Sequence, residues 1–132
     1  INSVRSMGDG QVLSVFNLKD NQYQIQANSG CVKQGKKSLE MAKCGNQKDQ
    51  KFNLHHINNS QEYNKHLLPG TQIEEDYAEI AYPFHLITPS DNKKKCVSMH
   101  GNKMSMVDCA DSKYHRFETF RKFKKCDSKY GN

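Results

Sequence analysis

Two stretches of this chain repeat each other: CVKQGKKSLEMAKCGNQKDQKF at residues 31–52 and CVSMHGNKMSMVDCADSKYHRF at residues 96–117. The two cysteines of each stretch are equally spaced, at positions 31 and 44 in the first copy and 96 and 109 in the second. Apolar residues alternate with polar ones at matching positions, such as Leu39 in the first copy and Met104 in the second. Alternation with a period of two is typical of a strand with one buried face, so each copy is predicted to form a β-hairpin.

The predicted hairpins bring their cysteines together. A hairpin of this length returns to its start, which places the two cysteines within the short Cα separation that a disulfide needs. We therefore predict the bridges Cys31–Cys44 and Cys96–Cys109, with buried reduced thiols as the alternative. Matched cysteine spacing in a chain with few apolar residues favours an oxidising compartment, and hence secretion. Cys126 is left over and is predicted to be a free thiol, or to pair with another chain or with a segment outside the given sequence.

The chain has 132 residues, which predicts one domain spanning 1–132. Only 35% of the residues are hydrophobic, but they gather in short groups of high strand propensity, such as Val12, Leu13, Val15 and Phe16. These groups indicate a small all-β core rather than disorder. No run of about 18 apolar residues occurs, so no membrane span is predicted.

Strands are also predicted on both sides of each hairpin, which gives a repeating unit of four strands. The turn Gly8-Asp9-Gly10 is expected to join two more strands. The middle segment, residues 58–83, holds enough apolar positions for two or three strands. It is expected to be either a shortened or irregular middle unit or an insertion between two neighbouring units. The flanking strands are predicted at residues 3–7, 11–18, 23–27, 51–57, 84–88 and 116–123.

The two copies share a series of short motifs. These are Cys31-Val32, Met41-Ala42-Lys43-Cys44, Asn46-Gln47 and Gln50-Lys51-Phe52, then Cys96-Val97, Met106-Val107-Asp108-Cys109 and His115-Arg116-Phe117. A strand, a Cys-aliphatic pair, a hairpin, a second Cys and a Gln-x-aromatic ending resemble the repeat of the ricin B-type β-trefoil. The resemblance implies an all-β fold of twelve strands in three units, with a closed barrel, capping hairpins and almost no helix. Another disulfide-bearing all-β barrel or sandwich is the alternative.

The sugar pockets of ricin B-type trefoils use an Asp two residues after the first Cys of a unit. Lys33 and Ser98 stand at those positions here. An ammonium group only donates hydrogen bonds, and a hydroxyl accepts them less strongly than a carboxylate does. Trp, the strongest stacking platform, is absent. The chain is therefore similar to trefoils whose galactose pockets are altered, such as the secreted ricin B-like proteins of microsporidian parasites.

Positive charge gathers near the C-terminus. The chain carries 20 Lys and Arg against 14 Asp and Glu, and residues 113–129 account for +5 of the net +6. Such a cluster binds polyanions in a salt-dependent way, and outside cells these are sulfated glycosaminoglycans and sialylated glycans. A solvated surface is the alternative. The candidate polyanion-binding residues are Lys113, Arg116, Arg121, Lys122, Lys124 and Lys125, the last two within a basic tail at 124–132.

No catalytic, metal-binding or cofactor-binding residues are predicted. The six histidines lack the spacing of a metal site, and His55 and His56 on one strand are expected to point to opposite faces. The acidic run at residues 74–79 is expected to be an exposed loop, because it lacks the alternate spacing of a calcium site. Asn58-Asn59-Ser60 makes Asn58 a candidate for N-glycosylation.

These features predict a secreted, non-enzymatic recognition module. Its expected partner is a glycan, including sulfated glycosaminoglycans, or a protein on a cell or extracellular surface. The alternative is a structural or protein-binding trefoil without a sugar site, assembled through Cys126. A third hypothesis, a nucleic-acid-binding domain of the cytoplasm, requires the paired cysteines to be reduced and is therefore disfavoured.

Overall fold

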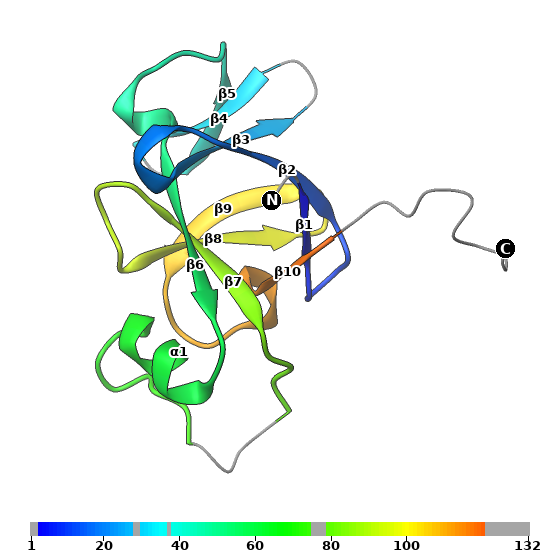
Figure 1. Ribbon diagram of the computed structural model, residues 1–132, viewed down its shortest axis with the longest axis vertical. Helices are drawn as coiled ribbons and strands as arrows, with labels where there is room; N and C mark the ends of the chain where they lie inside the picture. Colours follow the sequence, from blue (N-terminus) through cyan, green and yellow to red (C-terminus); the bar gives the residue numbers. More distant parts are fainter. Residues whose placement is uncertain (1–2, 28–29, 37, 75–78, 121–132) are drawn as a thin grey trace, which may run out of the picture.

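Six strands close into a barrel in this computed structural model, which describes residues 3–27, 30–36, 38–74 and 79–120. The barrel strands are β1 (Ser3–Ser6), β2 (Val12–Asn17), β3 (Gln22–Ala27), β6 (Phe52–Ile57), β7 (Phe84–Pro89) and β10 (Phe117–Thr119). They pair antiparallel in the order β2-β1-β10-β7-β6-β3, and the pairing of β3 with β2 closes the ring (Figure 1). The all-β fold is therefore confirmed.

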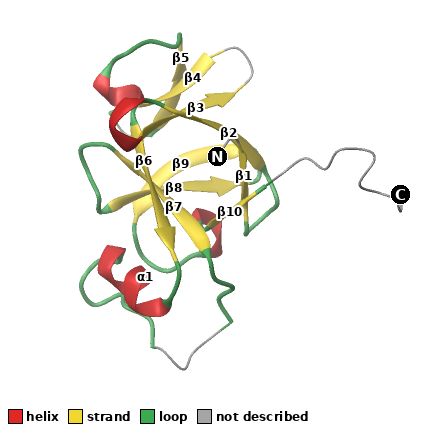
Figure 2. Cartoon of the chain, in the orientation of Figure 1, coloured by secondary structure: helices red, strands yellow, loops and turns green. Residues whose placement is uncertain are grey.

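The two predicted hairpins are also confirmed. The first consists of β4 (Gly30–Gln34) and β5 (Leu39–Ala42), and the second of β8 (Lys95–His100) and β9 (Lys103–Asp108) (Figure 2). A disulfide closes each of them at its base, between Cys31 and Cys44 with Cα atoms 4.9 Å apart and between Cys96 and Cys109 with Cα atoms 5.2 Å apart.

The correspondence between the two sequence copies is kept in the structure. Each hairpin is followed by a short 3-10 turn and then by a barrel strand that begins with a buried Phe. Fully burying a side chain of this size stabilises the fold by about 1.5–3 kcal/mol, which explains why Phe recurs at this position. The matched elements are β4 and β8, the turns Lys48–Gln50 and Lys113–His115, and β6 and β10, which begin at Phe52 and Phe117.

The barrel strands form three successive pairs, and only two of the pairs carry a hairpin. The strands β3 and β6 flank the first hairpin, and β7 and β10 flank the second. The strands β1 and β2 are instead joined by the predicted tight turn, in which Gly10 has a positive φ of 78°. Gly8 of this turn packs so closely on Tyr114 that a Cβ would clash with the ring. All three connections emerge at the same end of the barrel, where two hairpins and one tight turn therefore meet.

The segment 58–83 differs from its prediction. In the described part of this segment the chain forms one short helix, α1 (Ser60–His66), and no strand, so the expectation of two or three strands there is wrong. The Asn59 side chain accepts the N–H of Glu62 at 2.9 Å, and the Glu62 carboxylate accepts the N–H of Asn58 at 2.7 Å. The first bond satisfies one of the free N–H groups at the helix start, and the second ties the residue before the cap to the same turn. Because β6 pairs directly with β7, α1 belongs to an insertion between the two repeated units.

The helix α1 packs on the base of the second hairpin. Its buried face carries Tyr63 and Leu67, four residues apart, as a helical period requires. They lie in a hydrophobic cluster with Phe84 and with the Cys96–Cys109 disulfide. The backbone N–H of Leu68 donates to the carbonyl of Cys109 at 2.9 Å. The insertion is thus packed against, and hydrogen-bonded to, the disulfide region of the second hairpin.

The length of the last strand and the burial of β2 also differ from what the sequence predicts. The last strand, β10, is shorter than the predicted 116–123, whose residues from 121 onward lie outside the described part of the chain. On β2, Leu13 and Val15 point into the barrel core as expected, but Val12 and Phe16 are exposed.

Among the described residues no helix has the length and apolar character needed to cross a membrane.

Candidate functional site

A groove of about 730 Å³ opens at the end of the barrel where the connections meet. It lies between the first strand pair, which has no hairpin, and the two hairpins of the other pairs. The strand β2 and the end of β3 form one side, and the two hairpins form the rest. The lining residues are Gln11, Val12, Leu13, Ser14, Phe16, Gln26, Ala27, Val32, Leu39, Glu40, Met41, Met99, Asn102, Lys103 and Met104.

The groove exposes a set of large apolar side chains. Phe16 is 44% exposed, Val12 43% and Met41 52%, and all three line the groove. Phe16 and Val12 lie on the outer face of β2 because alternate residues of that strand point into the core. Exposed large side chains gathered at one concave place mark a binding surface more often than scattered ones do.

Polar groups lie among these apolar ones. Ser14 is directly opposite Gln26 in the β2–β3 register, so both side chains share the outer face with Phe16. Among the described residues, the side chains of Gln11, Ser14 and Asn102 make no hydrogen bond. An aromatic ring beside free amide and hydroxyl groups can stack on an apolar face of a ligand while hydrogen-bonding its polar edge.

The wall formed by the second hairpin is fixed by contacts at its tip. The Asp9 carboxylate, in the β1–β2 turn, accepts the N–H of Gly101 at the hairpin tip. Beside this contact, His100 packs edge-on against Tyr114 with ring centroids 4.2 Å apart. These contacts tie the tip to the tight turn of the first strand pair.

The wall formed by the first hairpin is fixed at its base by a glutamine. The buried amide of Gln50 accepts the N–H of Gly45 at 3.0 Å and donates to the carbonyl of Lys43 at 2.9 Å. Gln24 donates to the carbonyl of Gly45 at 3.1 Å. Gln50 is the Gln of the Gln-x-aromatic motif, so the motif holds the loop around the disulfide in place. A groove with two braced walls is largely preformed, which lowers the entropic cost of binding.

Lys33 and Ser98, the two positions that the sequence resemblance assigned to sugar pockets, do not offer a free acceptor. Lys33 pairs across the first hairpin with Glu40, with Nζ and Oε1 4.0 Å apart. Ser98 is buried in β8. The groove, rather than these two positions, is therefore the candidate binding site.

Of the six predicted polyanion-binding residues, only Lys113 and Arg116 lie in the described structure. Lys113 is exposed and lies over the ring of Tyr114, with Nζ 5.4 Å from the ring centroid. Arg116 has a side chain only 12% exposed and forms an ion pair with Asp111. Outside the described residues lie Arg121, Lys122, Lys124 and Lys125, the tail 124–132 and Cys126.

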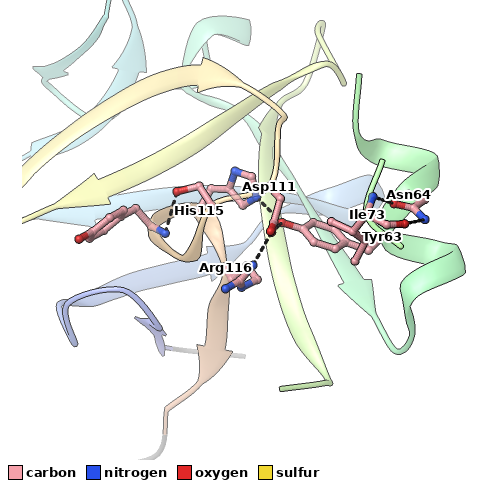
Figure 3. A network of polar contacts seen from close by, with 8 residues as sticks. Tyr63, Asn64, Ile73, Asp111, His115 and Arg116 are labelled. Atoms are coloured by element: carbon pink, nitrogen blue, oxygen red, sulfur yellow. Dashed lines mark hydrogen bonds and ion pairs between the residues drawn. The ribbon is translucent and has the colours of Figure 1, made fainter. Parts of the chain in front are cut away.

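A buried polar network links α1 to the second repeated unit (Figure 3). The Tyr63 hydroxyl donates to Asp111 Oδ1 at 2.7 Å, and His115 Nε2 lies 2.7 Å from the same hydroxyl oxygen. Because the hydroxyl has one proton and gives it to a carboxylate, Nε2 must carry the His115 proton. Burial, helped by the nearby Arg116, lowers the pKa of His115 to about 4. Burial also raises the pKa of Tyr63, with Asp111 adding to the effect.

This network has a structural role. Tyr63 and His115 are fully buried, so neither can reach a ligand. His115 occupies the position that Gln50 occupies in the first unit, and both side chains hold a neighbouring segment against the barrel. The neighbouring segment is the cysteine loop in the first unit and the α1 insertion in the second.

The remaining histidines form two close pairs. His55 lies 4.6 Å from His66 and His56 lies 4.9 Å from His85, measured between ring centroids. Burial lowers the pKa of His55 and of His85 to about 4, so both rings are neutral at physiological pH. Among the described residues, no three His, Cys, Asp or Glu side chains are grouped to hold a metal ion.

The two expected surface features of the insertion can be placed in part. Asn58 is exposed just before α1, as a glycosylation acceptor must be. Of the acidic run at residues 74–79, Glu74 and Glu79 are exposed and the four residues between them lie outside the described part.

Comparison with family models, curated proteins and solved structures gives no match to this chain.

Proposed function

We propose that this protein is a non-enzymatic recognition module that binds a glycan or a protein surface in the groove between β2 and the two hairpins. One observation carries the proposal: the three most exposed large apolar side chains of the described residues all line this one groove, beside amide and hydroxyl groups with no described partner. Concave sites that combine apolar surface with a few polar groups are where ligands usually bind.

The fold that we propose is a β-trefoil of ricin B-like type in which the first unit lacks its hairpin. The closed barrel, the two disulfide-closed hairpins and the position-by-position match of the two sequence copies support it. A trefoil has three capping hairpins, and here the place of the third is taken by the turn around Gly8. The groove is then the gap left by the missing hairpin. The two disulfides support secretion.

A glycan array, with neutral and sulfated sugars at two salt concentrations, tests this function. Phe16→Ala removes the stacking ring without touching the core and should weaken binding of a neutral hit roughly tenfold. Val107→Ala is the matched control, because Val107 is also an exposed apolar strand residue but lies outside the groove. Equal losses in the two variants would contradict the proposed site.

A protein partner is the second candidate, because Met41 and Val12 add exposed aliphatic surface that a sugar does not require. In this case Met41→Lys should abolish capture of the partner while glycan arrays stay blank. Assembly through Cys126 is a separate version of this candidate. It is tested by a non-reducing gel of wild type and Cys126→Ser, in which a dimer must vanish both on reduction and in the variant.

A further inference from the structure

A cluster of three lysines and one histidine lies at the base of the second hairpin, far from the groove. The register of β8 and β9 places Lys95 and Asp108 at the hairpin base and His100 and Lys103 at the tip, which lines the groove. The base is approached by the turn that precedes β8 and by the C-terminal end of α1. The cluster consists of Lys65, His66, Lys93 and Lys94, with His55 beside it.

Backbone hydrogen bonds hold the two segments of this cluster together. Cys109 donates its N–H to the carbonyl of Lys94 at 3.1 Å and accepts the N–H of Leu68 at 2.9 Å. One residue of the disulfide therefore connects the lysine turn to the end of α1. His66 in turn packs against His55, whose Nε2 lies 2.9 Å from Thr88 Oγ1. The backbone hydrogen bonds thus fix the positions of the Cα atoms that carry these side chains.

Three carboxylates on neighbouring segments have partners outside the cluster. Glu62 accepts the N–H of Asn58 at the far end of α1. Asp108 pairs with Lys95 at 2.6 Å, and Asp91 accepts a hydrogen bond from Gln34 at 3.1 Å. In the described part of the chain, no ion pair involves the lysines of the cluster, Lys65, Lys93 and Lys94.

The cluster therefore carries net positive charge, because its three lysines outnumber the one carboxylate that acts on His66, that of Glu62. Burial lowers the pKa of His66, and the ammonium groups of Lys94 and Lys93 lower it further, more than Glu62 raises it. Lys93 also contributes to the low pKa of His55. Like charges held together by the backbone cost stability, and an anion bound among them relieves that cost.

We propose that the cluster of Lys65, His66, Lys93 and Lys94 binds the sulfate groups of a sulfated carbohydrate chain. The two lysines of the turn and the lysine of α1 supply mobile ammonium donors, and the imidazole of His66 supplies a more rigid one. The cluster holds no Phe, Tyr or Trp among the described residues, although binding of single-stranded nucleic acid depends on stacked aromatic rings. The disulfides also favour a compartment in which sulfated glycans are the common polyanions.

This site deepens the proposed recognition function by naming one ligand class, and it is separable from the groove. Phe16→Ala should not change binding of a sulfated chain, and loss of the lysines should not change binding of a neutral glycan. If the groove binds nothing but the cluster binds, only the first proposal fails. If the reverse holds, only this one does.

Calorimetry with a short heparin oligosaccharide, and with the same oligosaccharide after desulfation, tests the proposal. Lys93→Gln/Lys94→Gln should weaken binding of the sulfated probe roughly tenfold and reduce its dependence on salt. Lys36→Gln/Lys43→Gln is the matched control, because it removes the same net charge from exposed lysines of the first hairpin. Equal effects of the two double variants, or equal binding of the desulfated probe, would overturn the site. Tighter binding of a single-stranded oligonucleotide would overturn the ligand class.

An NMR titration of His66 gives a second readout, because two separate changes should each raise its pKa. In the free protein, Lys93→Gln/Lys94→Gln should raise the pKa of His66, because it removes the repulsion of two ammonium groups. In the wild type, the sulfated probe should also raise this pKa, because an anion stabilises the imidazolium. The probe should leave the pKa unchanged in the double variant. A wild-type pKa that ignores the probe would refute the proposed contact.

Discussion

Acidification should lower the free energy of unfolding of this protein through His115. The variant His115→Gln tests this, because Gln stands at the matching position of the first unit. His115 is fully buried with a pKa of about 4, whereas an exposed histidine has a pKa near 6.5. The unfolded chain therefore binds a proton between these two values that the folded protein does not. Stability contributed by the neutral ring is complete above pH 6.5 and is lost as the pH falls toward 4.

The size of the effect follows from the two pKa values. One unit of pKa shift corresponds to about 1.4 kcal/mol, and most of the interval between 6.5 and 4 is crossed by pH 5. We therefore expect His115 alone to reduce the free energy of unfolding by about 2 kcal/mol between pH 8 and pH 5. His85, which is also buried with a pKa of about 4, adds a loss of the same sign.

Urea unfolding at pH 8 and pH 5 measures this difference directly. In His115→Gln, the loss on acidification should be smaller by about 2 kcal/mol than in the wild type, whatever the stability of the variant at pH 8. Gln stands at the matching position of the first unit, so a neutral amide is known to fit a buried site of this kind. His100→Gln, which changes an exposed histidine, is the control. An unchanged pH dependence in His115→Gln would refute the buried neutral ring.

Three further outcomes follow from the structure. Tyr63→Phe removes the hydroxyl that joins His115 to Asp111 and should lower the free energy of unfolding by about 1–3 kcal/mol, measured by thermal denaturation. Asn59→Ala removes the cap of α1 and should cost about 1 kcal/mol in the same assay, with the barrel circular dichroism unchanged. Mild reduction should open the first disulfide before the second, because Cys44 is exposed while both cysteines of the second bridge are buried. Alkylation followed by mass spectrometry gives the order, and the reverse order would contradict the burial.

Much of the fold could be predicted because its information is local. The alternating pattern of each repeat fixes a hairpin, and the hairpin fixes the distance between its cysteines, so both disulfides follow from spacing alone. The turn around Gly8 and Gly10 is equally local. These features depend on residues close in sequence, and they are confirmed.

The helix α1 could have been predicted, because its signals are present in the sequence. Asn59 and Glu62 have the spacing of a capping pair, and Tyr63 and Leu67 have the spacing of one helix face. The same asparagines also form a glycosylation motif, and the apolar residues that follow also fit strands. A segment of seven helical residues gives few periods with which to separate the two interpretations.

The groove could not be predicted, because it depends on how distant elements pack. Phe16 belongs to an apolar group on a strand, and such groups are usually core. Its exposure follows from the absence of a hairpin between β1 and β2, which leaves the outer face of β2 uncovered. The cluster at the base of the second hairpin also depends on distant elements. The backbone of Cys109 joins the turn at Lys94 to the end of α1, which carries His66.

The closure of the barrel ties the earliest and latest strands of the fold to each other. The strand β1 completes its hydrogen bonds only when β10 arrives, with Val4 opposite Thr119 and Arg5 bonded to Glu118 at 2.7 Å. A contact over so long a stretch of chain forms slowly and late, because the entropy of a large loop must first be lost. During synthesis, the ring therefore stays open between β1 and β7 until nearly all of these residues have left the ribosome.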